Sequence, residues 1–122
     1  MKTTTKAIEL KQMGKPDEVR SLPKTHVEVC NLAGISLMRA TFDPGWKWSE
    51  CVKPTAKTDS CMVEHLCYCI SGQMTVVMDD GTKTRIQPGD MAHIGAGHDA
   101  WIEGTEKCVL LDFSGGSNYA KK

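Results

Sequence analysis

The sequence has no block of like charge and no long apolar stretch. Its 122 residues include 15 basic and 15 acidic side chains, so the formal net charge is zero. Neither sign is gathered into a run that would attract nucleic acid or an anionic membrane. The longest apolar runs, such as 108–111, are far shorter than the roughly 20 residues that span a bilayer. We therefore expect no nucleic-acid partner and no membrane partner.

The sequence also shows no secretory signal, because residues 1–6 are polar and no apolar segment with a small-residue cleavage site follows them. Six cysteines could pair as disulfides only in an oxidising compartment. Their spacing does not form the two C-x-x-C pairs of a four-cysteine zinc site. We expect a cytoplasmic protein with free thiols, most of them buried as small apolar residues.

A sustained helical period is missing from residue 33 onward. Short apolar runs alternate instead with Gly, Pro and Asp turns about every ten residues, a pattern typical of an all-β sandwich or barrel. The strands expected from this pattern are 27–31, 35–42, 48–52, 61–71, 74–78, 83–86, 91–94, 98–103 and 108–113. Asp80-Gly81 should close a hairpin, because glycine accepts the positive φ of a tight turn. We predict a single-domain antiparallel β-barrel or jelly roll.

The two ends of the chain differ from this pattern. Residues 1–24 carry scattered charges and little periodicity, and we expect an arm with one strand near 7–10. Residues 25–114 form the expected barrel. Residues 115–122 are expected to be a frayed tail.

Two segments, 45–72 and 89–101, resemble the two motifs of the cupin superfamily, whose fold is a double-stranded β-helix barrel. In the first motif the glycines are kept at positions 45 and 72. The family places two histidines and a glutamate between them as metal ligands. By that alignment the three ligand positions hold Cys51, Lys53 and His65 here.

The second motif of that family ends on a fourth ligand, a histidine. Here Gly89 and Gly97 are kept, but Ala100 occupies the histidine position and His98 lies two residues earlier. Residues two apart on a strand share a face, so His98 can still point into the barrel. The resemblance therefore implies the fold, with an altered ligand set.

Strand alternation extends the expected pocket beyond these positions. If His65 faces inward, Cys67 and Cys69 face inward as well, and Cys51 shares its side with Lys53. The expected ligand-binding pocket therefore comprises Cys51, Lys53, His65, Cys67 and His98.

Three of these residues form the expected metal site. Cys51, His65 and His98 would offer a thiolate and two imidazoles, which suit a divalent transition metal and zinc best of all. Three protein ligands with an open fourth position are what catalytic zinc uses. Lys53 is a poor ligand because its amine is protonated near neutral pH.

Aromatic residues make up only 6% of the chain, and three of them are tryptophans. Strand parity places Trp48 and Trp101 opposite the pocket, where they would form a homodimer interface or be covered by the arm. If the strand near Gly45 bulges, the rings instead line the pocket and bind a flat or apolar ligand.

Three functions fit this reading, and we expect the first. It is a small barrel that binds a small molecule, with a transition metal in its interior. The second is a metal-dependent cupin enzyme, dioxygenase-like or isomerase-like, acting on a small organic substrate. The third is a thiol-based redox sensor that uses Cys51, Cys67 or Cys69. Many unrelated activities share one fold, so the fold names neither substrate nor reaction.

Overall fold

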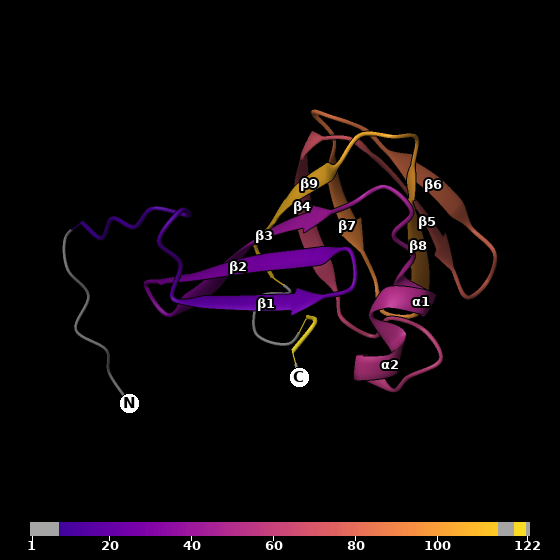
Figure 1. Cartoon of the computed structure of the whole chain (residues 1–122), viewed down its shortest axis with the longest axis horizontal. Coiled ribbons are helices and arrows are strands. Elements are labelled where there is room, and N and C mark those ends of the chain that lie inside the picture. Colours follow the sequence, from indigo (N-terminus) through magenta and orange to yellow (C-terminus); the bar gives the residue numbers. More distant parts are fainter. Residues whose placement is uncertain (1–7, 115–118, 122) are drawn as a thin grey trace.

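Two antiparallel sheets form the protein, as a computed structural model describes it for residues 8–114 and 119–121 (Figure 1). The larger sheet has the order β1 (Glu18–Leu22), β2 (Thr25–Leu32), β3 (Ile35–Phe42), β9 (Cys108–Asp112), β4 (His65–Ser71) and β7 (Met91–Ile94). The smaller sheet has the order β6 (Lys83–Ile86), β5 (Gln73–Met78) and β8 (His98–Glu103). The sheets share one core but do not close into a continuous barrel. The predicted all-β antiparallel class is confirmed.

Alternation along β4 shows how the core is built. His65, Cys67 and Cys69 are buried, while the residues between them are exposed. Successive side chains of a strand point to opposite faces, so every second residue of β4 enters the space between the sheets. The predicted inward direction of Cys67 and Cys69 follows from the same alternation.

Glycines mark the places where the chain reverses or changes sheet. Gly81 has a φ of +92° in the turn between β5 and β6, as predicted for this hairpin. Gly72 joins β4 of the larger sheet to β5 of the smaller one, with a φ of +74°. A Cβ at Gly72 would lie 2.5 Å from the backbone Cα of Cys108. The change of sheet therefore requires glycine for both its conformation and its size.

The predicted strand at 48–52 is wrong, because this segment folds into two short helices, α1 (Trp48–Cys51) and α2 (Lys53–Ala56). Trp48, Cys51 and Val52 are buried at the i, i+3 and i+4 spacing of a helix face. Pro54 lies in the first turn of α2, where its missing N–H costs nothing. In the described part of the chain, no helix has the length and apolarity needed to cross a membrane.

The amino-terminal strand is not where the sequence placed it. Ala7 lies outside the described residues, and 8–10 are not in a strand. The observed strand is β1, which pairs with β2 along its whole length.

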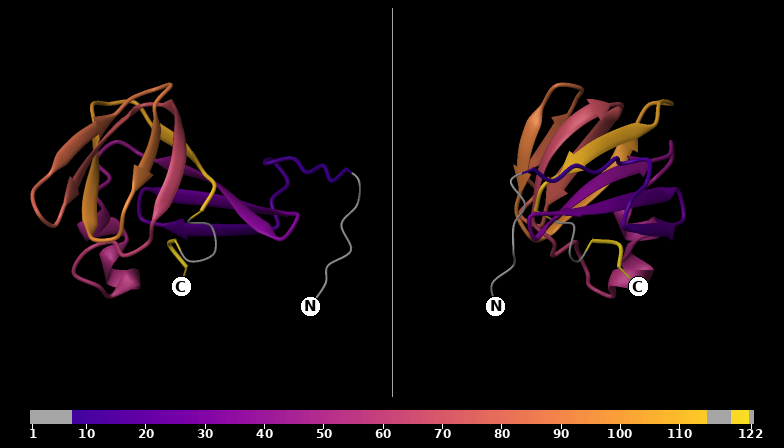
Figure 2. Two further views of the ribbon diagram at one scale, coloured as in Figure 1. Left: turned by 180° about the vertical axis from the view of Figure 1, so that it is seen from behind. Right: turned by 90° about the vertical axis from the view of Figure 1, so that its left-hand side faces the viewer.

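The carboxy-terminal end packs against β1. Residues 115–118 and 122 lie outside the described part, but Tyr119 and Ala120 are buried. Nη1 of Arg20, on β1, donates a hydrogen bond of 2.8 Å to the Tyr119 carbonyl. Figures 1 and 2 show this end of the chain beside β1, on the side of the molecule that carries the helices.

Candidate functional site

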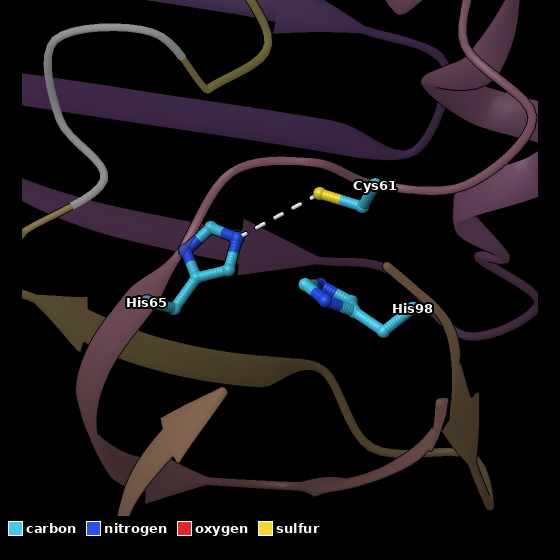
Figure 3. A group of neighbouring side chains, drawn as sticks. All are labelled: Cys61, His65 and His98. Atoms are coloured by element: carbon cyan, nitrogen blue, oxygen red, sulfur yellow. Dashed lines mark hydrogen bonds between the residues drawn. The ribbon is translucent and has the colours of Figure 1, made fainter. Parts of the chain in front are cut away.

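Three buried side chains come together between the sheets: Cys61, His65 and His98 (Figure 3). One ligand atom from each lies within 4.8 Å of the others. The Cys61 Sγ is 3.9 Å from Nε2 of His65, and the two imidazole ring centroids are 5.6 Å apart.

Backbone pairing holds these residues in place. His65 begins β4 and His98 begins β8, so the two rings come from different sheets. Cys61 lies before β4 in an isolated β-bridge with His98. The Cys61 amide donates to the His98 carbonyl at 2.7 Å, and the Gly97 amide donates to the Cys61 carbonyl at 2.7 Å. The thiol is therefore fixed against the strand that carries the second imidazole.

Each imidazole is oriented through its outer nitrogen. Nδ1 of His65 is hydrogen-bonded to the buried carboxylate of Asp112. Nδ1 of His98 lies 2.7 Å from the Gly95 carbonyl, which can only accept, so this nitrogen carries the proton. Each ring then keeps its Nε2 for the interior. Metal-binding histidines are commonly held in this way by a carboxylate or carbonyl behind them.

The same contacts shift the ionisation of the cluster. Burial favours the neutral thiol of Cys61, but hydrogen bonds from His65 and His98 outweigh it and lower the pKa of Cys61 to about 6. Burial opposes charge on His65, but Asp112 and Cys61 raise its pKa to about 9. In the metal-free protein near neutral pH, a thiolate therefore lies beside an imidazolium.

The predicted pocket residues have different positions in the structure. His65, Cys67 and His98 line an interior cavity. Cys51 is buried on α1 and is not one of the three residues that come together. Lys53 begins α2 and is half-buried, away from the lining of that cavity. The argument from parity that paired Cys51 with Lys53 does not apply, because the segment is helical.

Sequence reasoning missed Cys61 as a site residue, although a signal was present. It lies four residues before His65, and an even separation places two residues on the same face of an extended chain. The same parity that pointed to Cys67 and Cys69 thus also includes Cys61.

Two cavities adjoin the cluster, and Trp48 and Tyr119 line both. The inner cavity, of about 30 Å³, is surrounded by apolar side chains together with His65, His98 and Asp112. The outer cavity, of about 210 Å³, lies between the helices and the carboxy-terminal end, and Cys61 is part of its wall.

Trp48 differs from the main expectation, whereas Trp101 lies on the predicted face of its strand. Trp46 and Trp48 are each 2% exposed and line the inner cavity, so the prediction that Trp48 lies on the outer wall is wrong. The alternative prediction, in which tryptophan rings line the pocket, fits both Trp46 and Trp48. Trp101 is partly exposed, with the amines of Lys47 and Lys83 each 5.6 Å from its ring centroid.

The donor set fits a transition metal. Zinc–sulfur and zinc–nitrogen bonds of about 2.3 and 2.0 Å place tetrahedral donors roughly 3.5 Å apart. The observed separation of 3.9 Å between the Cys61 sulfur and the nearer His65 nitrogen needs only a small side-chain adjustment to reach this. A thiolate with two imidazoles leaves one tetrahedral position open.

The sequence matches no protein-family model and no curated protein. Solved structures resemble it in fold. The polyketide cyclase RemF from Streptomyces resistomycificus has 15% identity and a TM-score of 0.61, over 93% of this chain and 80% of that one. Ectoine synthase from P. lautus has 14% identity and a TM-score of 0.62, over 88% and 78%. KdgF from Halomonas sp. has 17% identity and a TM-score of 0.53, over 80% and 86%. All three are cupin-fold proteins, and likeness at such identities shows the cupin fold alone.

Proposed function

We propose that this cupin-fold protein holds a transition metal through Cys61, His65 and His98 and binds a small molecule beside it. The observation that carries the proposal is the orientation of the two imidazoles. Both are tethered at Nδ1, by Asp112 and by the Gly95 carbonyl, so both direct Nε2 toward one thiol. A bound metal would displace the proton that Nε2 of His65 carries in the metal-free protein near neutral pH. Buried imidazoles need a partner in any case, so the feature that favours a metal is that the second nitrogens of both rings converge with a thiol.

The donor types favour zinc or copper(I) over manganese or magnesium, because thiolate and imidazole are softer than carboxylate and water. A metal with one open position would supply Lewis-acid chemistry to a molecule bound next to it. The binding protein and the metal-dependent enzyme thus share one site. The residues of the chain hold and orient the metal, and Asp112 fixes the His65 ring.

Competitive metal loading tests this proposal. Protein purified without a histidine tag would be stripped of metal, offered zinc, cobalt(II) and manganese together, dialysed and analysed for its elements. We expect zinc to be retained in an equimolar amount. Cobalt loaded alone should give the near-ultraviolet band of a thiolate–cobalt bond.

Paired serine variants identify the thiol. Cys61→Ser should lose the cobalt–thiolate band and most of the retained zinc, whereas Cys51→Ser should keep both, because Cys51 lies outside the cluster. If Cys51→Ser loses the band and the zinc while Cys61→Ser keeps them, the thiol ligand is Cys51, as the family motif implied. Equal retention in both variants and wild type would exclude a metal site built on these thiols.

The thiol-sensor hypothesis has one observation in its favour. Cys61, His65 and Asp112 form a chain of hydrogen bonds that stabilises a thiolate. The earlier candidates Cys67 and Cys69 do not share it, because burial raises the pKa of Cys67 to about 12 and also raises that of Cys69. Sensor thiols are usually accessible, however, and Cys61 is only 2% exposed. We therefore favour the metal site.

A peroxide challenge separates the two functions. If Cys61 senses oxidants, a sulfenic-acid trap should label it first in the metal-free protein at low peroxide. If it serves as a metal ligand, zinc should protect it and labelling should be slow even without zinc.

A further inference from the structure

One tryptophan has a buried hydrogen-bond donor that no described residue satisfies. Nε1 of Trp46 donates to Thr25 Oγ1 at 2.9 Å, and Nε1 of Trp101 donates to Glu103 Oε2 at 2.9 Å. Nε1 of Trp48 is buried, in a residue that is only 2% exposed, and has no partner in the described part of the chain. Buried polar groups almost always find a partner, so an unpaired indole N–H needs an explanation.

The position of Trp48 offers an explanation for its unpaired N–H. The Trp48 side chain is part of the wall of both cavities, next to the candidate metal site, and its Nε1 has almost no accessible surface in the unliganded protein. The inner cavity of about 30 Å³ has room for only one or two water molecules. The outer cavity of about 210 Å³ is large enough for a small organic molecule. A ligand in the outer cavity would therefore contact the Trp48 side chain, and a small movement of the ring would bring Nε1 to it.

The lining of the outer cavity indicates the class of that ligand. Its apolar part is formed by Val52, Ala56, Met62, Val63 and Ala120, and its polar part includes the hydroxyls of two threonines. Among the described residues that line it there is no carboxylate, and its one ionic side chain, Lys121, is exposed to solvent. Because burying an unpaired charge is costly, this surface suits an uncharged molecule.

We propose that the outer cavity binds a small, uncharged, mainly apolar molecule with one oxygen acceptor, such as a carbonyl, which accepts the hydrogen of Trp48 Nε1. The inference rests on the proposed function, because Cys61 lies in the wall of the same cavity. The acceptor completes the hydrogen bonding of the indole, and the apolar body replaces water against the aliphatic side chains. Trp48 thereby determines specificity for the ligand.

A matched pair of probes tests this assignment. Cyclohexanone and methylenecyclohexane have nearly the same shape, but only the ketone has an acceptor oxygen. Each would be titrated into nitrogen-15-labelled protein while the three indole N–H resonances are followed by NMR. We expect the ketone to shift the Trp48 indole proton downfield and to bind about tenfold more tightly than the alkene, the ratio expected of one buried hydrogen bond.

The other tryptophans serve as controls, because their indoles are already paired. Their N–H resonances should move little. Trp48→Phe, which also assigns the Trp48 resonance, should bind both probes with similar affinity, whereas Trp101→Phe should keep the preference for the ketone. The wild-type comparison of ketone and alkene decides the question even if Trp48→Phe fails to fold.

Three outcomes would overturn the inference. They are an unresponsive Trp48 indole, equal affinity for the two probes, and a bound water that stays on the indole at saturating ketone. Running the titration on metal-free and zinc-loaded protein separates this inference from the metal proposal. Ketone binding without zinc retention contradicts only the metal site, and zinc retention without a ketone response contradicts only the ligand assignment.

Discussion

The Asp112 side chain illustrates how one residue prepares the site without reaching its centre. Its carboxylate holds Nδ1 of His65, and it is 3% exposed. Asp112→Asn keeps the shape and an acceptor but removes the negative charge that strengthens the imidazole as a ligand. We expect zinc affinity to fall about 10- to 100-fold, the usual cost of losing such a partner.

Chelator competition measures this loss in affinity. Asp90→Asn is the matched control, because Asp90 lies in an exposed turn before β7 and its side chain accepts from the Gln87 amide. Unchanged zinc affinity in Asp112→Asn would show that the histidine does not ligate a metal.

The opposite pKa shifts of Cys61 and His65 lead to a specific prediction for how the stability of the fold depends on pH. The pKa of His65 rises from 6.5 to about 9, so its contribution to stability is complete below pH 6.5 and is lost as pH rises through about 9. The pKa of Cys61 falls from 9.0 to about 6, so its contribution is complete above pH 9 and is lost as pH falls through about 6. Folded and unfolded pairs therefore bind nearly the same number of protons at every pH, and the two trends cancel.

Two measurements on metal-free protein check this prediction. Ultraviolet absorbance should show one thiolate appearing with a midpoint near pH 6, and Cys61→Ser should remove that transition. Between pH 6.5 and 9 the pair should add little slope to the free energy of unfolding. A thiolate midpoint above pH 8 would contradict the ion pair.

At the scale of elements, the helical segment explains why the residues of the candidate cluster could be predicted only in part. His65 and His98 begin regular strands, where alternation specifies direction. Cys51 follows a turn at Gly45, and the buried spacing of Trp48, Cys51 and Val52 fits a helix better than a strand. Five residues are too few for either period to stand out. The strand predicted for this segment was therefore the wrong local conformation.

The strand β1 was missed for a different reason. Of its five residues only Arg20 is buried, so it shows no apolar alternation. Its place depends on pairing with β2 and on the bond from Arg20 to the Tyr119 carbonyl. Both are tertiary contacts, which a local sequence pattern does not reveal.

Two glycine variants test the element boundaries. Gly81 and Gly72 both have positive φ, but a Cβ meets nothing within 4 Å at Gly81 and backbone atoms at 2.5 Å at Gly72. Gly81→Ala should cost about 1 kcal/mol from the backbone alone, and Gly72→Ala about 3 kcal/mol or more because the strands must also separate. Urea unfolding measures both, and equal losses would contradict the close approach of β4–β5 to β9.

At the scale of the whole molecule, the turns and short apolar runs were sufficient to predict an all-β antiparallel fold of the barrel or jelly-roll kind, although the two sheets do not close. The predicted bounds of β3, β6, β7 and β8 coincide with those observed. Turn glycines and alternation are local signals that agree with the final fold. The order of the strands within the sheets is set by long-range pairing, and the sequence pattern did not specify it.

Because Trp48 is buried, it cannot contribute to the predicted homodimer interface, and another surface is needed. The outer face of the larger sheet offers one. Leu66, Tyr68 and Ile70 of β4 are 50%, 38% and 47% exposed, and Met91 beside them on the edge strand β7 is 82% exposed. Contiguous apolar surface of this kind is typical of an interface. A chain of zero net charge places no long-range repulsion between two copies.

We therefore expect a homodimer that buries the β4–β7 face, with twice the 13.4 kDa mass of one chain in sedimentation at tens of micromolar. Leu66→Lys with Ile70→Lys places like charges opposite each other in a two-fold interface and should give the monomer. His26→Lys, at an exposed position on β2 of the same sheet, should leave the dimer intact. Because both lysines replace outward-facing residues of β4, zinc retention should not change. A wild-type monomer at these concentrations, or a dimer that survives both lysines, would show that this face is not the interface.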